Sequence, residues 1–221
     1  MDTTKSYIPA LGLRWLTPLY DPLIHRLMRE DVLRERLVLE ADILPGMRVL
    51  DLGCGTGTLA ILVKRSHVLA QVFGLDADPQ VLGIAHSKAD RAGARITLDQ
   101  GLAYQLPYPD GWFDRVLSSL VFHHLTTDQK QQALNEVFRV LQPGGKFTIL
   151  DVGVPRGVYA GLVSQIIRRT EQAEDNIKGL IPMMMKQAGL LNIIELEHFT
   201  SLFGSLTLHQ AEKPAQPSDE S

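Results

Sequence analysis

Residues 49–57 decide the fold of this chain, and they read Val49-Leu50-Asp51-Leu52-Gly53-Cys54-Gly55-Thr56-Gly57. The apolar start of this stretch indicates the end of a buried strand, after which glycine recurs at every second position. Glycine lacks a Cβ and tolerates positive φ, so residues 53–57, here called the glycine loop, can turn sharply beside a ligand. A helix expected from Thr58 directs unpaired N–H groups back over the loop. The sequence therefore predicts a ligand site at a strand end.

The spacing of the glycines indicates which ligand is expected. The loop reads G-x-G-x-G, whereas a dinucleotide fingerprint requires G-x-G-x-x-G and a phosphate loop requires G-K-[ST]. Asp51 would repel a pyrophosphate but suits a positive group such as the amine of a methionine moiety. Asp76 ends the next expected strand, where a carboxylate can accept hydrogen bonds from both ribose hydroxyls. The alternatives are a turn without a ligand and, for Asp76, a helix cap, although Asp78 fits that role better.

Short apolar runs alternate with helical segments through the middle of the chain. This alternation predicts a parallel sheet with helices on both faces. After it, residues 155–189 are expected to be mostly helical, and the runs 191–197 and 203–210 predict an antiparallel pair at one sheet edge. Strands are expected at 47–52, 68–75, 94–98, 112–119 and 146–152, and helices at 22–40, 58–66, 79–92 and 126–141.

A single domain over residues 1–211 is therefore expected. It would comprise an N-terminal cap (1–44), a cofactor-binding core (45–152) and a region of substrate-side helices and edge strands (153–211). The polar residues 212–221, which include two prolines, are expected to form a disordered tail.

Composition excludes several classes of protein. Hydrophobic residues make up 45% and charged residues 21% of the chain, which is typical of a soluble globular domain. The net charge of -3 provides no basic field, so no nucleic-acid partner is expected. Cys54 is the single cysteine, which favours a reducing compartment, and we expect neither a signal peptide nor a transmembrane segment. The chain is therefore expected in the cytoplasm. The histidine spacing predicts no metal site, and no feature indicates the oligomeric state.

Residues 49–57, followed by Asp76, resemble motif I and its following acid in the class I S-adenosylmethionine-dependent methyltransferases. In order and spacing, the later motifs resemble the branch that contains the ubiquinone and menaquinone C-methyltransferases. The resemblance implies a Rossmann-like α/β fold, with a seven-stranded mostly parallel sheet, an antiparallel edge strand and an N-terminal helical cap. It is carried further by residues 100–103 (Gln-Gly-Leu-Ala), 106–110 (Leu-Pro-Tyr-Pro-Asp), 113–116 (Phe-Asp-Arg-Val) and 136–145 (Glu-Val-Phe-Arg-Val-Leu-Gln-Pro-Gly-Gly).

The resemblance also implies that S-adenosylmethionine is the cofactor and assigns residues to its parts. The glycine loop, including Cys54, would pack under the methionine moiety near Asp51. Asp76 would bind ribose, and the adenine would lie near Ala77 and residues 101–103. Ser119 and Leu120, after the fourth strand, would pass close to the methyl group. In order along the chain, the loop and adenine positions are Gly53, Cys54, Gly55, Gly57, Ala77, Gly101, Leu102 and Ala103.

Two positions stand apart from this pattern. Leu102 occupies the place where the family usually has an Asp on the adenine amino group, and a leucine side chain cannot accept a hydrogen bond. Tyr20, followed by Asp21, resembles an N-terminal Tyr-Asp that folds over the cofactor in many relatives. The alternative for Tyr20 is simple packing against the first helix.

The expected function is methyl transfer to a small, partly apolar acceptor through carbon, oxygen or nitrogen, by in-line displacement. His123 and His124 follow the fourth strand, and a histidine can remove a proton near neutral pH. The alternative is that they line the loop or cap the helix expected from Thr126. The alternatives to methyl transfer are cofactor binding without transfer, and nicotinamide-dependent oxidoreduction, which the loop spacing disfavours.

Overall fold

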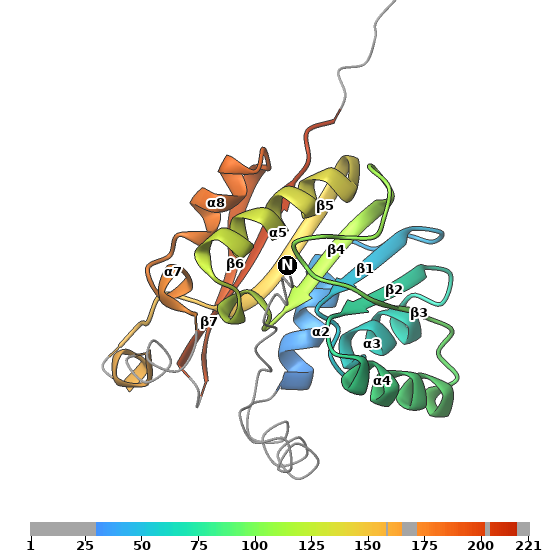
Figure 1. Ribbon diagram of the computed structural model, residues 1–221. Helices are drawn as coiled ribbons and strands as arrows, with labels where there is room; N and C mark the ends of the chain where they lie inside the picture. Colours follow the sequence, from blue (N-terminus) through green and yellow to red (C-terminus); the bar gives the residue numbers. More distant parts are fainter. Residues whose placement is uncertain (1–29, 158, 165–171, 202–203, 216–221) are drawn as a thin grey trace, which may run out of the picture.

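A computed structural model describes residues 30–157, 159–164, 172–201 and 204–215 of the chain (Figure 1). Seven strands form one sheet in the order β3-β2-β1-β4-β5-β7-β6. The sheet contains β1 (Arg48–Leu52), β2 (Gln71–Asp76), β3 (Thr97–Gln100), β4 (Phe113–Ser119), β5 (Leu141–Val152), β6 (Leu191–Ser201) and β7 (Gly204–Glu212). The helices are α2 (Glu30–Glu40), α3 (Thr58–Ser66), α4 (Pro79–Ala92), α5 (Thr127–Val140), α7 (Glu174–Ile177) and α8 (Ile181–Gln187).

The first five strands pair in parallel, as the alternation of strands and helices predicts. β7 runs antiparallel to both of its neighbours and lies between β5 and the edge strand β6. The carboxyl ends of β1, β2, β4 and β5 therefore meet at one edge of the sheet, here called the carboxyl edge. The predicted seven-stranded, mostly parallel fold with an antiparallel pair at one side is confirmed.

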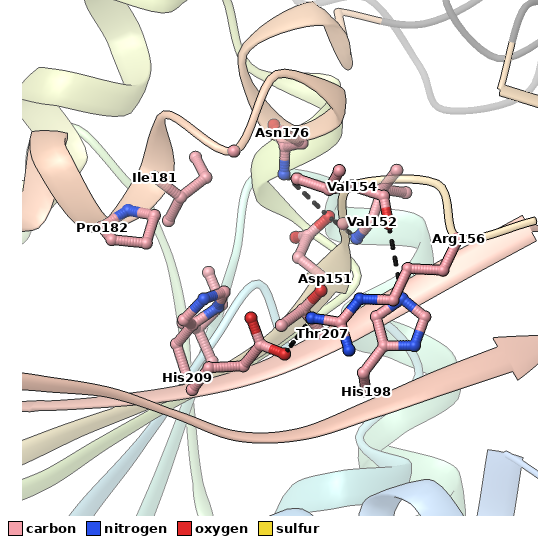
Figure 2. A pocket seen from close by; sticks show the side chains of 14 residues that line it. Asp151, Val152, Val154, Arg156, Asn176, Ile181, Pro182, His198, Thr207 and His209 are labelled. Carbon is pink, nitrogen blue, oxygen red and sulfur yellow. Dashed lines mark hydrogen bonds and ion pairs between the residues drawn. The ribbon is translucent and has the colours of Figure 1, made fainter. Parts of the chain in front are cut away.

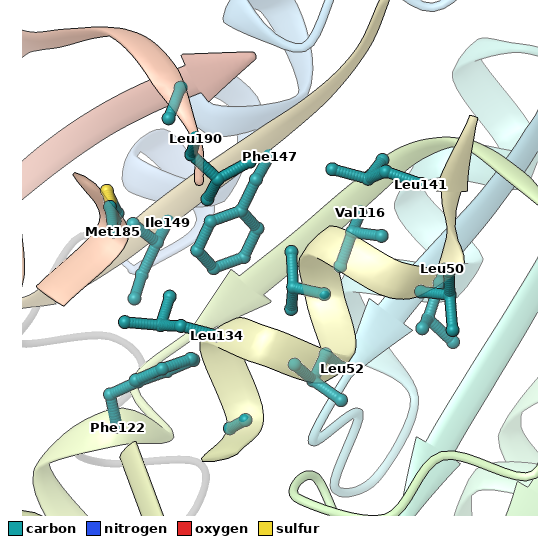
Figure 3. Packing of buried hydrophobic residues seen from close by; sticks show 14 of the residues in the cluster. Leu50, Leu52, Val116, Phe122, Leu134, Leu141, Phe147, Ile149, Met185 and Leu190 are labelled. Carbon is teal, nitrogen blue, oxygen red and sulfur yellow. The ribbon is translucent and has the colours of Figure 1, made fainter. Parts of the chain in front are cut away.

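Two apolar layers cover the two faces of the sheet. On one face, α2 and α3 pack their buried residues, including Leu37 and Val63, against β1, β4 and β5. On the other face, Leu134 of α5 and Met185 of α8 pack against Phe147 and other strand residues (Figure 3). Strands covered on both faces must be apolar throughout, which explains why they read as continuous apolar runs.

Local signals set the helix boundaries. The side chain of Asp78 accepts a hydrogen bond from the backbone N–H of Gln80 and so caps α4, whose last residue is followed by Gly93 in the left-handed conformation. Helix α5 begins with a capping box, in which Thr126 and Gln129 satisfy each other's backbone N–H groups. These helices begin and end within one residue of their predicted bounds.

Several predicted boundaries are wrong. β2 begins at Gln71 rather than at residue 68, because the apolar side chains of Val68 and Leu69 lie exposed in a turn. The predicted tail begins too early, since Glu212 pairs within β7 and Lys213 donates a backbone hydrogen bond to Gly145. The predicted first part of the cap, residues 1–29, lies outside the described residues. The same holds for residues 158 and 165–171 of the predicted helical region and for residues 216–221.

Candidate functional site

The glycine loop connects β1 to α3 at the carboxyl edge. The N–H groups of Gly53 and Cys54 both donate to the carbonyl of Leu75 in β2, over 2.8 and 2.9 Å. Gly53, Gly55 and Gly57 all have positive φ, at 74°, 51° and 74°. These φ angles explain why glycine, which has no Cβ penalty in this region, occupies all three positions.

The surroundings of the three glycines differ, and the difference locates the open side of the loop. A Cβ on Gly53 would lie 2.4 Å from a methyl group of Val121, and one on Gly57 would lie 3.0 Å from the Cβ of Ala85. Nothing lies within 4 Å of the Cβ position of Gly55. A ligand can therefore approach the backbone at Gly55, whereas Gly53 and Gly57 are needed for packing.

Asp51 is the next-to-last residue of β1, beneath the loop, and is only 2% exposed. Its Oδ2 accepts a hydrogen bond from the N–H of Ala60 in α3 over 2.9 Å. Within the described part of the chain, its other oxygen accepts no hydrogen bond. Burial raises the pKa of Asp51 to about 7, although the Ala60 hydrogen bond opposes that shift. A positive ligand group would relieve the cost of this buried carboxylate, so the residue fits the amine of the predicted cofactor.

Asp76 joins the glycine loop to the end of β2. Its Oδ2 accepts from the N–H of Gly55 over 2.8 Å, and its Oδ1 accepts from the N–H of Asp78 over 3.0 Å. Each carboxylate oxygen can accept two hydrogen bonds, so one place remains on each oxygen for a ribose hydroxyl. The carbonyl of Asp76 accepts from the N–H of Gly101, and that of Ala77 from Gln100, so the residues expected at ribose and adenine lie together.

Leu102 begins a short turn and forms an isolated bridge with Gln105. The nearby carboxylate of Asp99 accepts a hydrogen bond from the Tyr108 hydroxyl over 2.9 Å. Burial and this carboxylate together raise the pKa of Tyr108, so the phenol keeps its proton. Asp99 is therefore bound to Tyr108 and does not supply the carboxylate that Leu102 lacks. Ala103 packs against the core beside this turn.

The chain turns sharply where β4 ends. Ser119 is the last residue of the strand, and Leu120 has a φ of 60°, which is unusual for a residue with a side chain. The N–H of Leu120 donates to Leu150 in β5 over 2.9 Å. This turn sends the following residues across the carboxyl edge toward β5.

His123 pairs with a buried carboxylate that is not among the predicted site residues. Its Nδ1 lies 2.7 Å from Oδ1 of Asp151, and the two side chains are 12% and 5% exposed. Burial alone would raise the pKa of Asp151, but the charge of His123 and hydrogen bonds from His123, Val152 and Phe122 hold it below its usual value. Asp151 is therefore ionised and binds the imidazole of His123 directly.

His124 lies in the same 3-10 turn, with its ring centroid 4.0 Å from that of His123. Neither histidine caps α5, because Thr126 and Gln129 form that cap. The capping alternative is therefore wrong, and lining of the loop remains the alternative to a chemical role for these two rings.

A cavity of about 240 Å³ lies beside Asp151, between the segment that holds α7 and α8 and the sheet face formed by β5, β7 and β6 (Figure 2). Ile181 and other apolar side chains line it together with the polar groups of Asn176, Thr207 and His209. Burial lowers the pKa of His209, which favours a neutral ring.

The charges around this cavity are paired. Arg156 and Glu195 form an ion pair at 2.7 Å, with exposed side chains, and Asp151 is paired with His123. Within the described residues the cavity therefore carries no unpaired charge, and it suits a neutral, partly apolar group.

The predicted site residues mostly come together. The glycine loop, Asp51, Asp76 and residues 101–103 gather at the ends of β1, β2 and β3, and Ser119, Leu120 and the two histidines follow β4. Tyr20 lies outside the described residues. Asp151 is not among the predicted site residues, although, like Asp51 and Asp76, it stands near the end of a predicted strand. Asn176, Thr207 and His209 are not among them either, because no motif marks these residues.

Among the described residues, no group of three or more histidine, cysteine, aspartate or glutamate side chains could hold a metal ion. Within the same residues, no helix has the length and apolar character needed to cross a membrane.

Comparison with known proteins agrees with this geometry. Residues 49–145 match a family described as a methyltransferase domain. An uncharacterized methyltransferase of Synechocystis sp. is 42% identical over 153 residues, covering 66% of this chain and 67% of that protein. A demethylmenaquinone methyltransferase of Thermus thermophilus is 39% identical over 119 residues, covering 54% of this chain and 53% of that protein. The chain thus spans about half the length of that second relative.

Solved structures share the fold. A SAM-dependent methyltransferase from Aquifex aeolicus superposes with a TM-score of 0.67 at 18% identity, covering 94% of this chain and all of that one. Phosphoethanolamine N-methyltransferase 2 of Haemonchus contortus, in complex with S-adenosyl-L-methionine, gives a TM-score of 0.69 at 19% identity, covering 82% of this chain and 52% of that one. At these identities the similarity shows the fold alone. The sequence relatives, taken with the glycine loop, show that this chain belongs to the S-adenosylmethionine-dependent methyltransferases.

Proposed function

We propose that this chain transfers the methyl group of S-adenosylmethionine to a small, neutral, partly apolar acceptor bound in the cavity beside Asp151. The observation that carries the proposal is the position of that cavity. It lies at the end of β5, next to β4, on the same edge of the sheet as the glycine loop. Adjacent strands lie about 5 Å apart, so an acceptor in the cavity would be close to a methyl group held above the end of β4.

The cofactor would be held by the residues already described. Asp51 would bind the amine of the methionine moiety, and the open backbone at Gly55 would pack beneath it. Asp76 would accept hydrogen bonds from ribose, and residues 77 and 101–103 would contact adenine through their backbone and through the apolar face of Leu102. Ser119 and Leu120 would lie near the methyl group.

Alignment of the acceptor with the methyl group would supply most of the rate enhancement. S-adenosylmethionine, when bound, supplies an electrophilic methyl group on a sulfonium. An acceptor that must lose a proton also needs a base, and we propose His123 for this role because Asp151 orients its ring. His124, which lies against His123, is the second candidate. The base would take the proton of the acceptor, and the freed electron pair would form the bond to the methyl carbon as its bond to sulfur breaks and S-adenosylhomocysteine leaves.

The names of the relatives suggest a finer proposal for the acceptor. Several are called demethylmenaquinone or ubiquinone/menaquinone biosynthesis methyltransferases. A reduced quinone ring is neutral, partly apolar and carries hydroxyl groups, so it fits a cavity whose charges are paired. A cavity of about 240 Å³ is smaller than the usual ligand site and would hold the ring alone.

The cellular setting is part of the same proposal. We place the protein in the cytoplasm with a reduced Cys54, which is buried and whose pKa burial raises. The net charge of -3 supports a small-molecule rather than a nucleic-acid partner.

Two measurements test this proposal. Calorimetry should give binding of S-adenosylmethionine and S-adenosylhomocysteine but not of NAD; the reverse result would identify an oxidoreductase. A screen with methyl-labelled cofactor should then label neutral hydroxylated rings in preference to amino acids or phosphoamines. Binding without labelling of any acceptor class would favour a protein that holds the cofactor without methyl transfer.

The two histidines can be separated in the same transfer assay. His123→Gln is expected to lower the rate by about 10²- to 10⁴-fold, which is the usual contribution of a general base. His124→Gln serves as the matched comparison, because the two rings are in contact. A larger loss from His124→Gln than from His123→Gln would reverse the assignment.

A further inference from the structure

Five donors converge on the carboxylate of Asp151, which is 4% exposed. Oδ2 accepts two backbone N–H groups over 3.0 and 2.7 Å. Oδ1 accepts a third at 2.7 Å, an amide NH₂ at 3.3 Å and Nδ1 of the imidazole at 2.7 Å. In the same order, the donors belong to Val121, Phe122, Val152, Asn176 and His123. Such a set leaves the carboxylate ionised and able only to accept hydrogen bonds.

An ionised carboxylate decides where the imidazole proton lies. Because Asp151 has no proton to give, Nδ1 of His123 must carry the hydrogen of their shared bond. In the neutral ring, Nε2 then holds the lone pair. Hydrogen bonding of one ring nitrogen thus sets the chemistry of the other.

Asn176 binds the same oxygen of Asp151, Oδ1, as the histidine does. It lies in α7 and is 1% exposed, and Figure 2 shows its amide directed at Asp151. Its Oδ1 is buried and has no hydrogen-bond partner in the described part of the chain. An apolar residue would avoid that buried oxygen, so the NH₂ group is the useful part of this side chain.

The preceding residue fixes α7 itself. Asp175 accepts hydrogen bonds from Thr127 and from the fully buried Lys130, both in α5. Lys130 also donates to the carbonyl of Gln172. Consecutive residues of α7 therefore bind α5 and Asp151, and this arrangement leaves little freedom at the carboxylate.

We propose that Asp151 is a positioning residue that holds His123 in the Nδ1–H tautomer, with its lone pair on Nε2, and that Asn176 keeps Asp151 in place. The use of that lone pair as a base rests on the proposed function; the tautomer itself does not. Asp151 and Asn176 also line the cavity, so the residues that position the base also form part of the acceptor site.

The first test reads the tautomer directly, without cofactor or acceptor. Long-range ¹H–¹⁵N correlation spectra of ring-labelled protein above pH 8 distinguish a protonated nitrogen from one with a lone pair. Wild-type His123 should show Nδ1 protonated. A wild-type ring protonated on Nε2 would overturn the proposal, and this measurement does not depend on any variant folding.

The second test replaces the carboxylate. In Asp151→Ala, Nδ1 of His123 loses the carboxylate that accepts its hydrogen. The ring should then no longer be held as the Nδ1–H tautomer, and the transfer rate should fall by about 10²- to 10⁴-fold. The matched control is Asp114→Ala, because Asp114 also accepts from a backbone N–H but lies at the start of β4, away from the carboxyl edge. It should leave both the tautomer and the rate unchanged.

The outcomes separate the two proposals. An unchanged tautomer in Asp151→Ala would refute the positioning role, whatever the rate. A changed tautomer with full activity would keep that role and refute His123 as the base. Asn176→Ala should keep the wild-type tautomer and lower the rate about tenfold, the effect of one hydrogen bond to a charged group. An unaltered rate would remove Asn176 from the proposal.

Discussion

Replacing Asp51 with asparagine should stabilise the folded protein above neutral pH and weaken cofactor binding at the same time. The folded protein binds the Asp51 proton up to a pH of about 7, whereas an unfolded chain releases it near 3.8. Between these values, raising the pH favours the unfolded state, because only the folded state still holds the proton. Each pH unit in this range lowers the free energy of unfolding by about 1.4 kcal/mol.

From pH 5 to pH 8, Asp51 should therefore remove about 3 kcal/mol from the free energy of unfolding, nearly all of it below pH 7. Asparagine keeps an oxygen for the N–H of Ala60 but does not titrate. The assay is urea unfolding of the wild type and Asp51→Asn at four pH values between 5 and 8. The difference between the two proteins isolates Asp51 from other titrating groups. Two stability curves that run parallel over this range would refute the reasoning.

Cofactor binding, unlike folding stability, should be favoured by raising the pH. If the amine binds ionised Asp51, wild-type affinity for S-adenosylmethionine should fall about tenfold between pH 7 and pH 5.5, as the carboxylate gains its proton. Asp51→Asn should bind weakly at every pH. Calorimetry at several pH values measures both effects, and a flat wild-type profile would remove Asp51 from the amine site.

Four further substitutions test the remaining parts of the site. Gly53→Ala should unfold or strongly destabilise the protein, because its Cβ would lie 2.4 Å from Val121; Gly55→Ala should cost only about 1 kcal/mol in stability but abolish cofactor binding. Equal effects of the two in thermal melts would contradict the assignment of the open side. Asp76→Ala frees the N–H of Gly55 and should weaken S-adenosylmethionine binding strongly, with unchanged affinity by calorimetry counting against ribose recognition. Lys130→Ala leaves the Asp175 carboxylate without its cation and should destabilise the fold by about 3–5 kcal/mol in urea unfolding; a loss below 1 kcal/mol would show that α7 is held otherwise.

The cofactor side of the site could be predicted because its determinants are local. The glycine loop, the caps at Asp78 and Thr126 and the acid after β2 each depend on a few consecutive residues. Val68 and Leu69 misled the prediction because their apolar character does not reveal that they lie in an exposed turn.

The acceptor side could not be predicted in the same way. Asp151 and His123 are 28 residues apart in sequence, and Asn176 joins them from a separate short helix. Thr207 reaches the cavity because β7 inserts antiparallel beside β5 and pairs it with Asp151. Such contacts depend on strand order and helix placement, which sequence periodicity does not encode.

The order of the strands also explains why the family match identifies the cofactor but does not identify the methyl acceptor. The matched family segment ends at residue 145, and every residue that lines the cavity follows it, beginning with Ile149. β4 stands between β1 and β5, so the late part of the chain can change length or composition without displacing the glycine loop. Exchanging residues 149–212 between relatives should therefore transfer acceptor choice as a unit, while the cofactor half of the sheet stays the same.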